Sequence, residues 1–187
     1  QTGMRIIGEQ AAQSLGVDVV AASSKMGEEF VQANEKMRML ILSLPAEQQQ
    51  DAGLALDRFR WRVWAKMPEL ARDLMLERST SLDALRDPAA WAGKRADYAR
   101  LALRQGDWAL AEKLAAAHFM PPGSDEFIDL EWLAGYAALR GGAPDRALVR
   151  FKALEAGVTS PISVSRALYW QGRALEAQGN AAQADAA

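Results

Sequence analysis

The pattern of hydrophobic and polar positions along the chain predicts helices and gives little sign of strands. Val, Ile and Thr rarely alternate with polar residues, as they would in a half-buried strand, and the helix formers Ala, Leu, Arg, Glu and Gln dominate. The sequence therefore predicts an all-α fold. The expected helices span residues 4–14, 22–43, 49–66, 68–78, 88–105, 107–118, 125–141, 144–156 and 161–178.

The first 45 residues give the least regular pattern. Glycines interrupt it at positions 3, 8, 16 and 27. Residues 17–20, with the sequence Val-Asp-Val-Val, fit either a short strand or a buried link. We interpret the region as helical.

Proline and glycine mark where the later helices are expected to begin and end. Asp87-Pro88 and Ser160-Pro161 each place a capping side chain before a proline at the first helical position, where the missing N–H is not needed. Glycine is common directly after the last turn of a helix, where the backbone becomes left-handed. Three glycines stand at such places, and they are Gly106, Gly142 and Gly179.

Aligned with itself, the chain shows a repeat of 36 to 40 residues. An offset of 37 pairs Gly135 with Gly172, Ala137 with Ala174, Ala138 with Leu175, Gly142 with Gly179 and Ala147 with Ala184. An offset of 36 pairs Leu103 with Leu139, Arg104 with Arg140, Gly106 with Gly142 and Ala111 with Ala147. A weaker copy at an offset of 40 pairs Trp61 with Leu101 and Ala71 with Ala111. This period resembles the ~34 residues of tetratricopeptide repeats, in which stacked helix pairs bury faces that no pair can bury alone. We predict a right-handed α-superhelix, or solenoid, of tetratricopeptide-like helix pairs.

The repeat also defines the expected domains. Residues 1–50 are an N-terminal helical segment of unclear type, and residues 51–187 are the α-superhelical repeat domain. The last repeat has a first helix and a turn, but residues 181–187 supply only about two turns of its second helix. We therefore expect the domain to be truncated at its C-terminal end.

Composition excludes several classes of protein. The net charge of −2 argues against broad electrostatic attraction to nucleic acid or to an anionic membrane. The chain has no cysteine, which excludes disulfides and thiolate metal sites. No apolar run approaches the ~20 residues of a transmembrane helix, and no signal peptide is visible.

The sequence offers little catalytic chemistry. His118 is the only histidine and has no second ligand at metal-binding spacing, so we interpret it as a histidine near a helix end. The carboxylate pairs, which are Glu28-Glu29, Asp125-Glu126 and Asp129-Glu131, fit solvated faces or first turns of helices better than an acid in an apolar cleft. We predict no catalytic residue, no metal site and no cofactor.

One basic and aromatic stretch, residues 58–66, is a candidate binding surface. Arg58, Trp61 and Arg62 could hold anionic or sugar groups, with the guanidinium forks binding and the indole stacking. The favoured alternative is an amphipathic helix in which Phe59, Trp61 and Trp64 enter the core while Arg58, Arg62 and Lys66 face water. The tryptophans at positions 91, 108, 132 and 170 are likewise expected in the core, with Trp132 and Trp170 largely buried.

Several segments resemble the superhelical, non-catalytic domain of bacterial soluble lytic murein transglycosylases. They are GLALDRFRWRVWAK at 53–66, ERSTS at 77–81, DLEWLAGYAALR at 129–140 and GVTSPISVSRALYWQGRALEAQGN at 157–180. The resemblance covers about residues 53–180. It implies a periplasmic enzyme that cleaves the glycan strands of peptidoglycan and leaves a 1,6-anhydromuramyl end. In that family the work is done by a C-terminal lysozyme-like domain with a catalytic glutamate followed by serine, and no glutamate here precedes a serine.

Two functions remain open. The chain resembles the scaffold of a lytic transglycosylase, with the parent's C-terminal catalytic domain and peptidoglycan as its partners. The alternative is a stand-alone helical-repeat module that binds a protein or peptide in its concave groove. A downstream domain with a Glu-Ser motif in the reading frame would favour the first.

Overall fold

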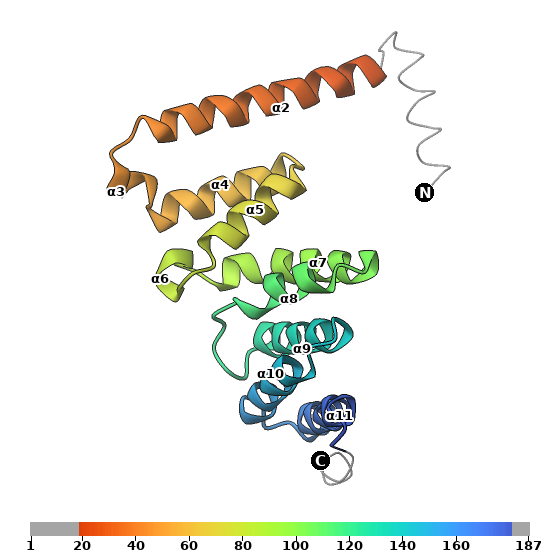
Figure 1. The fold of residues 1–187 in the computed structure, drawn as a ribbon. Helices are drawn as coiled ribbons and strands as arrows, with labels where there is room; N and C mark the ends of the chain where they lie inside the picture. Colours follow the sequence, from red (N-terminus) through yellow and green to blue (C-terminus); the bar gives the residue numbers. More distant parts are fainter. Residues whose placement is uncertain (1–18, 181–187) are drawn as a thin grey trace. The chain divides into compact units, whose positions relative to one another are not determined.

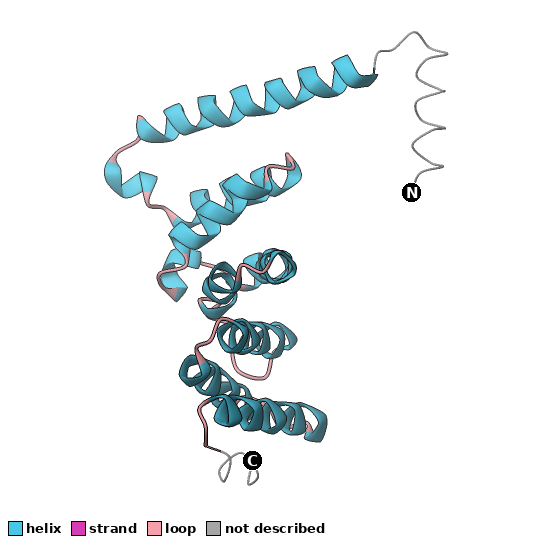
Figure 2. Cartoon of the chain, turned by 45° about the vertical axis from the view of Figure 1, so that its right-hand side comes forward, coloured by secondary structure: helices cyan, strands magenta, loops and turns pink. Residues whose placement is uncertain are grey.

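Residues 19–180 are the part of the chain that the computed structural model describes, and they are helical with no strand (Figures 1 and 2). The predicted all-α class is confirmed. The helices are α2 (Val19–Leu42), α3 (Ala46–Gln49), α4 (Ala52–Trp64), α5 (Pro68–Arg78), α6 (Leu82–Leu85), α7 (Ala89–Gln105), α8 (Trp108–Ala116), α9 (Asp125–Arg140), α10 (Pro144–Ala156) and α11 (Pro161–Ala177).

Most helix positions follow the sequence prediction, and the differences have local causes. The predicted helix 49–66 is wrong at its start, because the Asp51 carboxylate accepts a 2.6 Å hydrogen bond from Leu54 N–H and begins a new helix. The short helices α3 and α6 are not among the predicted helices, and Ser81 caps α6 by accepting from Ala84 N–H at 3.1 Å. Val19 and Val20 are helical, so the alternative of a strand there is wrong. The predicted helix 4–14 and the remainder of 17–20 lie outside the described residues.

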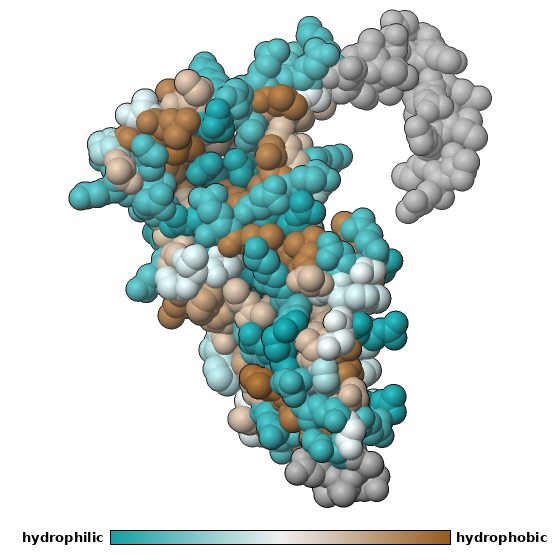
Figure 3. Space-filling model, in the orientation of Figure 1, coloured by the Kyte–Doolittle hydropathy of each residue, from teal (hydrophilic) through white to brown (hydrophobic). Residues whose placement is uncertain are grey.

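The chain divides into two compact units, residues 1–50 and residues 51–187. In the first unit, α2 is a long helix with several exposed apolar side chains, and Figure 3 shows hydrophobic residues on its surface. In the second unit, each helix from α7 to α11 packs against the next, and α9 also packs against both α7 and α11 (Figure 1). A hydrophobic core of buried residues runs continuously from α4 to α11.

Four helices of the second unit end in the same way. After each one, a residue with positive φ is followed by an amide that donates to the carbonyl five positions earlier. The donor and acceptor pairs are Met67 and Arg62 (2.9 Å), Asp107 and Ala102 (3.0 Å), Ala143 and Ala138 (2.9 Å), and Asn180 and Leu175 (2.9 Å). The acceptors are 40, 36 and 37 residues apart, which are the offsets of the sequence repeat.

The left-handed positions in these four ends are Lys66, Gly106, Gly142 and Gly179, with φ of 57°, 77°, 76° and 82°. The three glycines therefore stop helices as predicted, because only glycine adopts this conformation without a steric cost. At the end of α4, Lys66 has the same left-handed backbone conformation, which is sterically unfavourable for a residue with a side chain.

Small residues at matched positions bring helices together. Ala111 and Ala147 are fully buried, as are Ala137 and Ala174. A β-carbon built on Gly135 in α9 would lie 2.5 Å from Phe151 Cε1 in α10, so the two helices approach too closely for any side chain there.

The tryptophans occupy the core unequally. Trp91 is fully buried, stacks on Phe59 with ring centroids 4.3 Å apart, and donates to the carbonyl of Leu85 at 3.1 Å. Trp132 and Trp170 are partly buried and pack against the buried cluster of Ala138, Ala147, Phe151 and Ala174, which agrees with the predicted core location although neither ring is fully enclosed. Their rings meet edge-on between α9 and α11, with centroids 5.8 Å apart.

Candidate functional site

The structure does not assemble the predicted surface of Arg58, Trp61 and Arg62. Arg62 is only 8% exposed, and its Nη1 donates a 2.8 Å hydrogen bond to the Leu70 carbonyl in α5. The prediction that Arg62 faces water or a ligand is therefore wrong. The physical reason is that α5 folds back against α4 and covers the guanidinium, which then donates to the Leu70 carbonyl in place of water.

Arg58 and Trp61 are half-buried, and burial lowers the pKa of Arg58 from its ordinary value, with Glu77 acting in the opposite direction. Burial also lowers the pKa of Arg62. Trp64, which the sequence places in the core, is 68% exposed because the helix face opposite Phe59 turns outward. The stretch is amphipathic, but its buried face carries an arginine and its outer face a tryptophan.

The predicted carboxylate pairs are dispersed. Asp125 and Glu126 lie exposed in the first turn of α9, where they complement the helix dipole. Asp129 accepts two hydrogen bonds from Arg100 of α7, at 2.6 and 2.7 Å. Glu131, which the sequence pairs with Asp129, is buried on the other side of the helix. None of these arrangements places two carboxylates at one accessible centre.

A group of ionisable side chains that we name the His118 cluster comprises the buried His118 and Glu131 and the half-buried Arg150. His118 Nε2 lies 3.0 Å from Glu131 Oε1, and its Nδ1 accepts a 2.9 Å hydrogen bond from Met120 N–H. With Nδ1 as the acceptor, Nε2 carries the proton and donates to the glutamate. Arg150 Nη1 approaches the same Oε1 at 3.3 Å.

The His118 cluster fixes a loop and offers no site for a reaction. His118 and Glu131 are both nearly inaccessible to water, and the histidine ring also packs edge-on against Phe127 with centroids 5.7 Å apart. The imidazole bridges the end of α8, the following loop and α9 through two hydrogen bonds. Among residues 25–180, no group of three His, Asp or Glu side chains could hold a metal ion. His118 is thus a histidine near a helix end, as the sequence indicated, and it has a structural role.

An open groove between α9 and α11 combines aromatic and basic groups. Its lining residues are Tyr136, Leu139, Arg140, Tyr169, Trp170, Arg173 and Ala177. The ring of Trp170 meets Tyr136 edge-on at 5.3 Å and Tyr169 at 5.4 Å. Tyr169 is 62% exposed, and no carboxylate is among the lining residues. We name this the α9–α11 groove.

Trp132 extends the aromatic groups of the α9–α11 groove. It stacks on Tyr136 with centroids 5.1 Å apart, and the guanidinium of Arg166 lies over its ring at 4.4 Å. Its indole Nε1 is buried without a hydrogen-bond partner. Aromatic faces with guanidinium groups at their edges bind planar, apolar or anionic groups of a ligand.

Sequence reasoning missed this groove because its residues come from two helices more than 30 positions apart. The repeat carried a partial signal, since the 37-residue offset pairs Trp132 with Tyr169. Matched aromatic positions in successive repeats indicate a continuous aromatic face. The packing of α11 against α9 was needed to show that Tyr169 stays exposed while Trp132 and Trp170 are partly buried.

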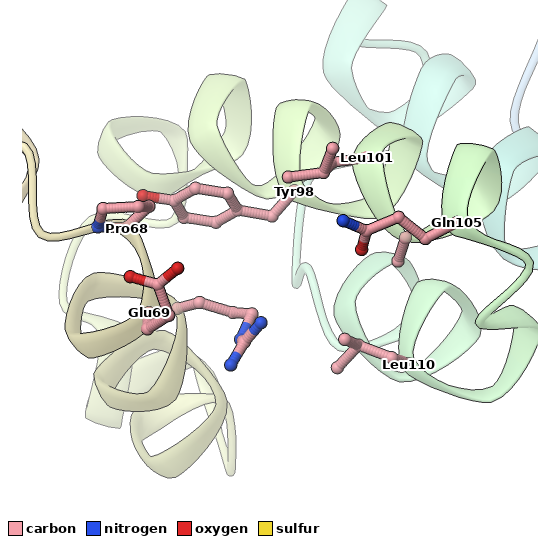
Figure 4. A pocket seen from close by; sticks show the side chains of 8 residues that line it. Pro68, Glu69, Tyr98, Leu101, Gln105 and Leu110 are labelled. Carbon is pink, nitrogen blue, oxygen red and sulfur yellow. The ribbon is translucent and has the colours of Figure 1, made fainter.

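A second, small pocket lies between α5, α7 and α8 (Figure 4). Glu69 faces Tyr98 across it, with Gln105 and Leu110 at its other end. Burial raises the pKa of the Tyr98 phenol. One carboxylate and a protonated phenol, without a nucleophile or a second acid, give this pocket no recognisable catalytic arrangement.

None of the helices within residues 19–180 combines the length and apolar character needed to cross a membrane. Comparison of the chain with known protein families, with curated proteins and with solved structures finds no match to any of them.

Proposed function

We propose that residues 51–187 form an α-superhelical scaffold of tetratricopeptide-like helix pairs, and that this scaffold belongs to a periplasmic lytic transglycosylase. The reaction, cleavage of peptidoglycan glycan strands, is assigned to a separate catalytic domain. The observation that carries the proposal is the recurring helix end at 36- to 40-residue spacing, together with the resemblance of residues 53–180 to this scaffold.

The packing supports a superhelix because neighbouring helix pairs use equivalent positions. The matched alanines Ala111 and Ala147 are both fully buried in the second helices of their pairs. α9 packs against α7 before it and α11 after it, which is the arrangement of stacked repeats. A repeated rotation from one pair to the next then generates the curvature of a solenoid.

The positions of the carboxylates among the described residues support a scaffold without catalytic activity of its own. The carboxylates that could act as a general acid are exposed, paired with arginine, or buried in the His118 cluster. A glycosidase-like acid must reach the glycosidic oxygen of its substrate. The scaffold contributes instead by holding the catalytic domain and by contacting the glycan strand.

The α9–α11 groove is the surface that we assign to the glycan strand. Pyranose rings stack on exposed aromatic side chains, and the carboxylates of peptidoglycan pair with guanidinium groups. Tyr169 supplies the most exposed ring of the groove, while the charges come from Arg140, which lies over the Trp108 ring, and from Arg173, which pairs with Glu176 at 2.7 Å.

A binding and product assay tests this function. The purified chain is incubated with insoluble peptidoglycan, and the expected result is retention without release of anhydromuropeptides. Tyr169→Ala should reduce retention at least severalfold, whereas Trp64→Ala, which removes a similarly exposed ring on α4, should leave it unchanged. Retention that persists in moderate salt separates specific binding from charge alone. Anhydromuropeptide products that disappear on a single Glu→Gln change would overturn the scaffold assignment.

A second candidate is a helical-repeat module that binds an acidic protein segment. The observation that favours it is that two arginines, Arg140 and Arg173, line the α9–α11 groove, where Arg173 now pairs with Glu176 at 2.7 Å and would exchange that carboxylate for one of the partner. A reading frame with no Glu-Ser domain, together with loss of peptidoglycan retention, would favour this module over the scaffold.

A further inference from the structure

Helix α2 carries apolar residues at alternating spacings of four and three. They are Met26, Phe30, Ala33, Met37, Leu40 and, just after the helix, Leu44. This is the spacing of the a and d positions of a coiled coil, in which Phe30, Met37 and Leu44 take a and Met26, Ala33 and Leu40 take d. We name these six residues the α2 seam.

The d positions of the α2 seam face outward. Met26 is 56% exposed and Leu40 is 60% exposed, and Ala33 is exposed as well. The a positions Phe30, Met37 and Leu44 are half-buried, and Ile41 beside them is buried. Long apolar side chains at d positions are stabilised when a second helix covers them.

The charged residues beside the α2 seam indicate that its partner is α2 of a second copy of the chain. The g positions, which flank a on one side, hold Glu29 and Lys36. In an antiparallel pair of helices, g positions face g positions of the partner. Two copies of α2 in antiparallel register then bring Glu29 of each copy opposite Lys36 of the other, which gives two opposite-charge pairs.

The same register also fits the sizes of the seam residues. It places the large Phe30 of one copy opposite the small Ala33 of the other, and Met26 opposite Met37. A large residue facing a small one fills the space between helices, and methionine adapts to irregular gaps. A parallel pair would instead face Phe30 with Phe30 and would leave Glu29 and Lys36 unmatched.

We propose that α2 is a dimerisation helix that pairs with α2 of a second copy of this chain as an antiparallel coiled coil. The interface is the α2 seam, and the Glu29–Lys36 pairs set its direction. The chain leaves α2 at its C-terminal end, so the two copies leave the coiled coil at opposite ends. The proposal is independent of the glycan function assigned to residues 51–187.

Cysteine crosslinking tests the direction, because the native chain has no cysteine. In the antiparallel register, a single Met26→Cys places the two thiols about 16 Å apart along the axis, since 11 residues at about 1.5 Å each separate positions 26 and 37. That distance exceeds the reach of a disulfide. The double variant Met26→Cys/Met37→Cys should form a covalent dimer under mild oxidation, and each single variant should not. A dimer from either single variant would overturn the antiparallel arrangement.

Charge reversal tests whether the Glu29–Lys36 pairs stabilise the antiparallel dimer. Lys36→Glu should raise the dimer dissociation constant about tenfold at low salt, because each copy then faces glutamate with glutamate. The double variant Glu29→Lys/Lys36→Glu should restore the native value. Lys25→Glu makes the same change of charge at an outer position of α2 and serves as the matched control.

Sedimentation equilibrium over about 1 to 200 µM measures the dissociation constant of the full chain, because association must depend on concentration. Met26→Glu/Leu40→Glu should abolish the dimer, while Val31→Glu, at an exposed apolar position off the seam, should keep it. A native chain that stays monomeric at the highest concentration overturns the proposal. A dimer that Met26→Glu/Leu40→Glu leaves intact places the interface elsewhere and overturns it as well.

Discussion

Gly135 has no room for a β-carbon, so Gly135→Ala is expected to destabilise residues 51–187 although alanine is the best helix former. The residue lies inside α9, where its Cα faces the ring of Phe151 in α10. A β-carbon would lie 2.5, 2.8 and 2.9 Å from three ring atoms. Ordinary contact between carbon atoms needs about 3.5–4 Å. Ring or helix must therefore move by about 1 Å.

The magnitude follows from two opposing effects. Phe151 is fully buried and stacks on Trp170 with ring centroids 5.8 Å apart, so its ring cannot swing away without disturbing a second ring. Overpacking of this kind costs about 1–3 kcal/mol. The gain in helix propensity offsets about 0.5–1 kcal/mol of it. The expected net loss in the free energy of unfolding is about 1–2 kcal/mol.

Urea unfolding followed by circular dichroism at 222 nm measures this loss, with Gly93→Ala as the control. Gly93 lies inside α7, and a β-carbon there would meet nothing within 4 Å. The control should gain about 0.5–1 kcal/mol. With a slope of about 2 kcal/mol per molar urea, the midpoints should shift by about 0.5–1 M downward for Gly135→Ala and by a smaller amount upward for Gly93→Ala.

A double-mutant cycle assigns the loss to the ring contact. Phe151→Leu removes the ring edge that a β-carbon would meet, so Gly135→Ala should cost at least ~1 kcal/mol less in that background. A Gly135→Ala protein as stable as the native one, or additive losses in the double variant, would show that α9 and α10 do not approach as closely as described.

Three further predictions concern other parts of the fold and use the same unfolding assay. Lys66→Gly should stabilise by about 1 kcal/mol, because it relieves the positive φ at the first of the four matched helix ends, and a loss would contradict that geometry. Trp91→Ala should destabilise by about 3–5 kcal/mol, whereas the exposed Trp64→Ala should stay within about 0.5 kcal/mol, so equal effects would contradict the assigned faces. His118→Leu should cost about 1–3 kcal/mol, because the buried Glu131 carboxylate loses a donor, and an unchanged midpoint would remove the structural role of the imidazole.

Sequence determined the helices and most of their ends. Capping residues and glycines act within a few positions of the chain, so their effect can be read without knowing what packs against the helix. Gly106, Gly142 and Gly179 stop helices because of a backbone preference that is local to each residue. The helix beginning at residue 161 is predicted correctly, although Ser160 makes no capping hydrogen bond with its side chain. Its proline alone suffices as a start signal.

Only the tertiary structure decided which side chains are available for binding. Arg62 and Trp64 lie two positions apart on one amphipathic helix, and sequence periodicity assigned both of them to the wrong side of it. Periodicity divides a helix into faces, but the direction in which the next helix folds back decides which face is covered. Here α5 covers the face that includes Arg62, and its Leu70 carbonyl holds the guanidinium there.

The α9–α11 groove and the His118 cluster depend on the same long-range packing. Tyr136 and Tyr169, or His118 and Arg150, are brought together by helices that meet across 30 or more residues of chain. Local propensity holds no information on such pairs, because their distance is fixed by how small residues such as Gly135 let helices approach. The sequence alone therefore specified the longer helices of this protein, and the close packing between them decided its surfaces.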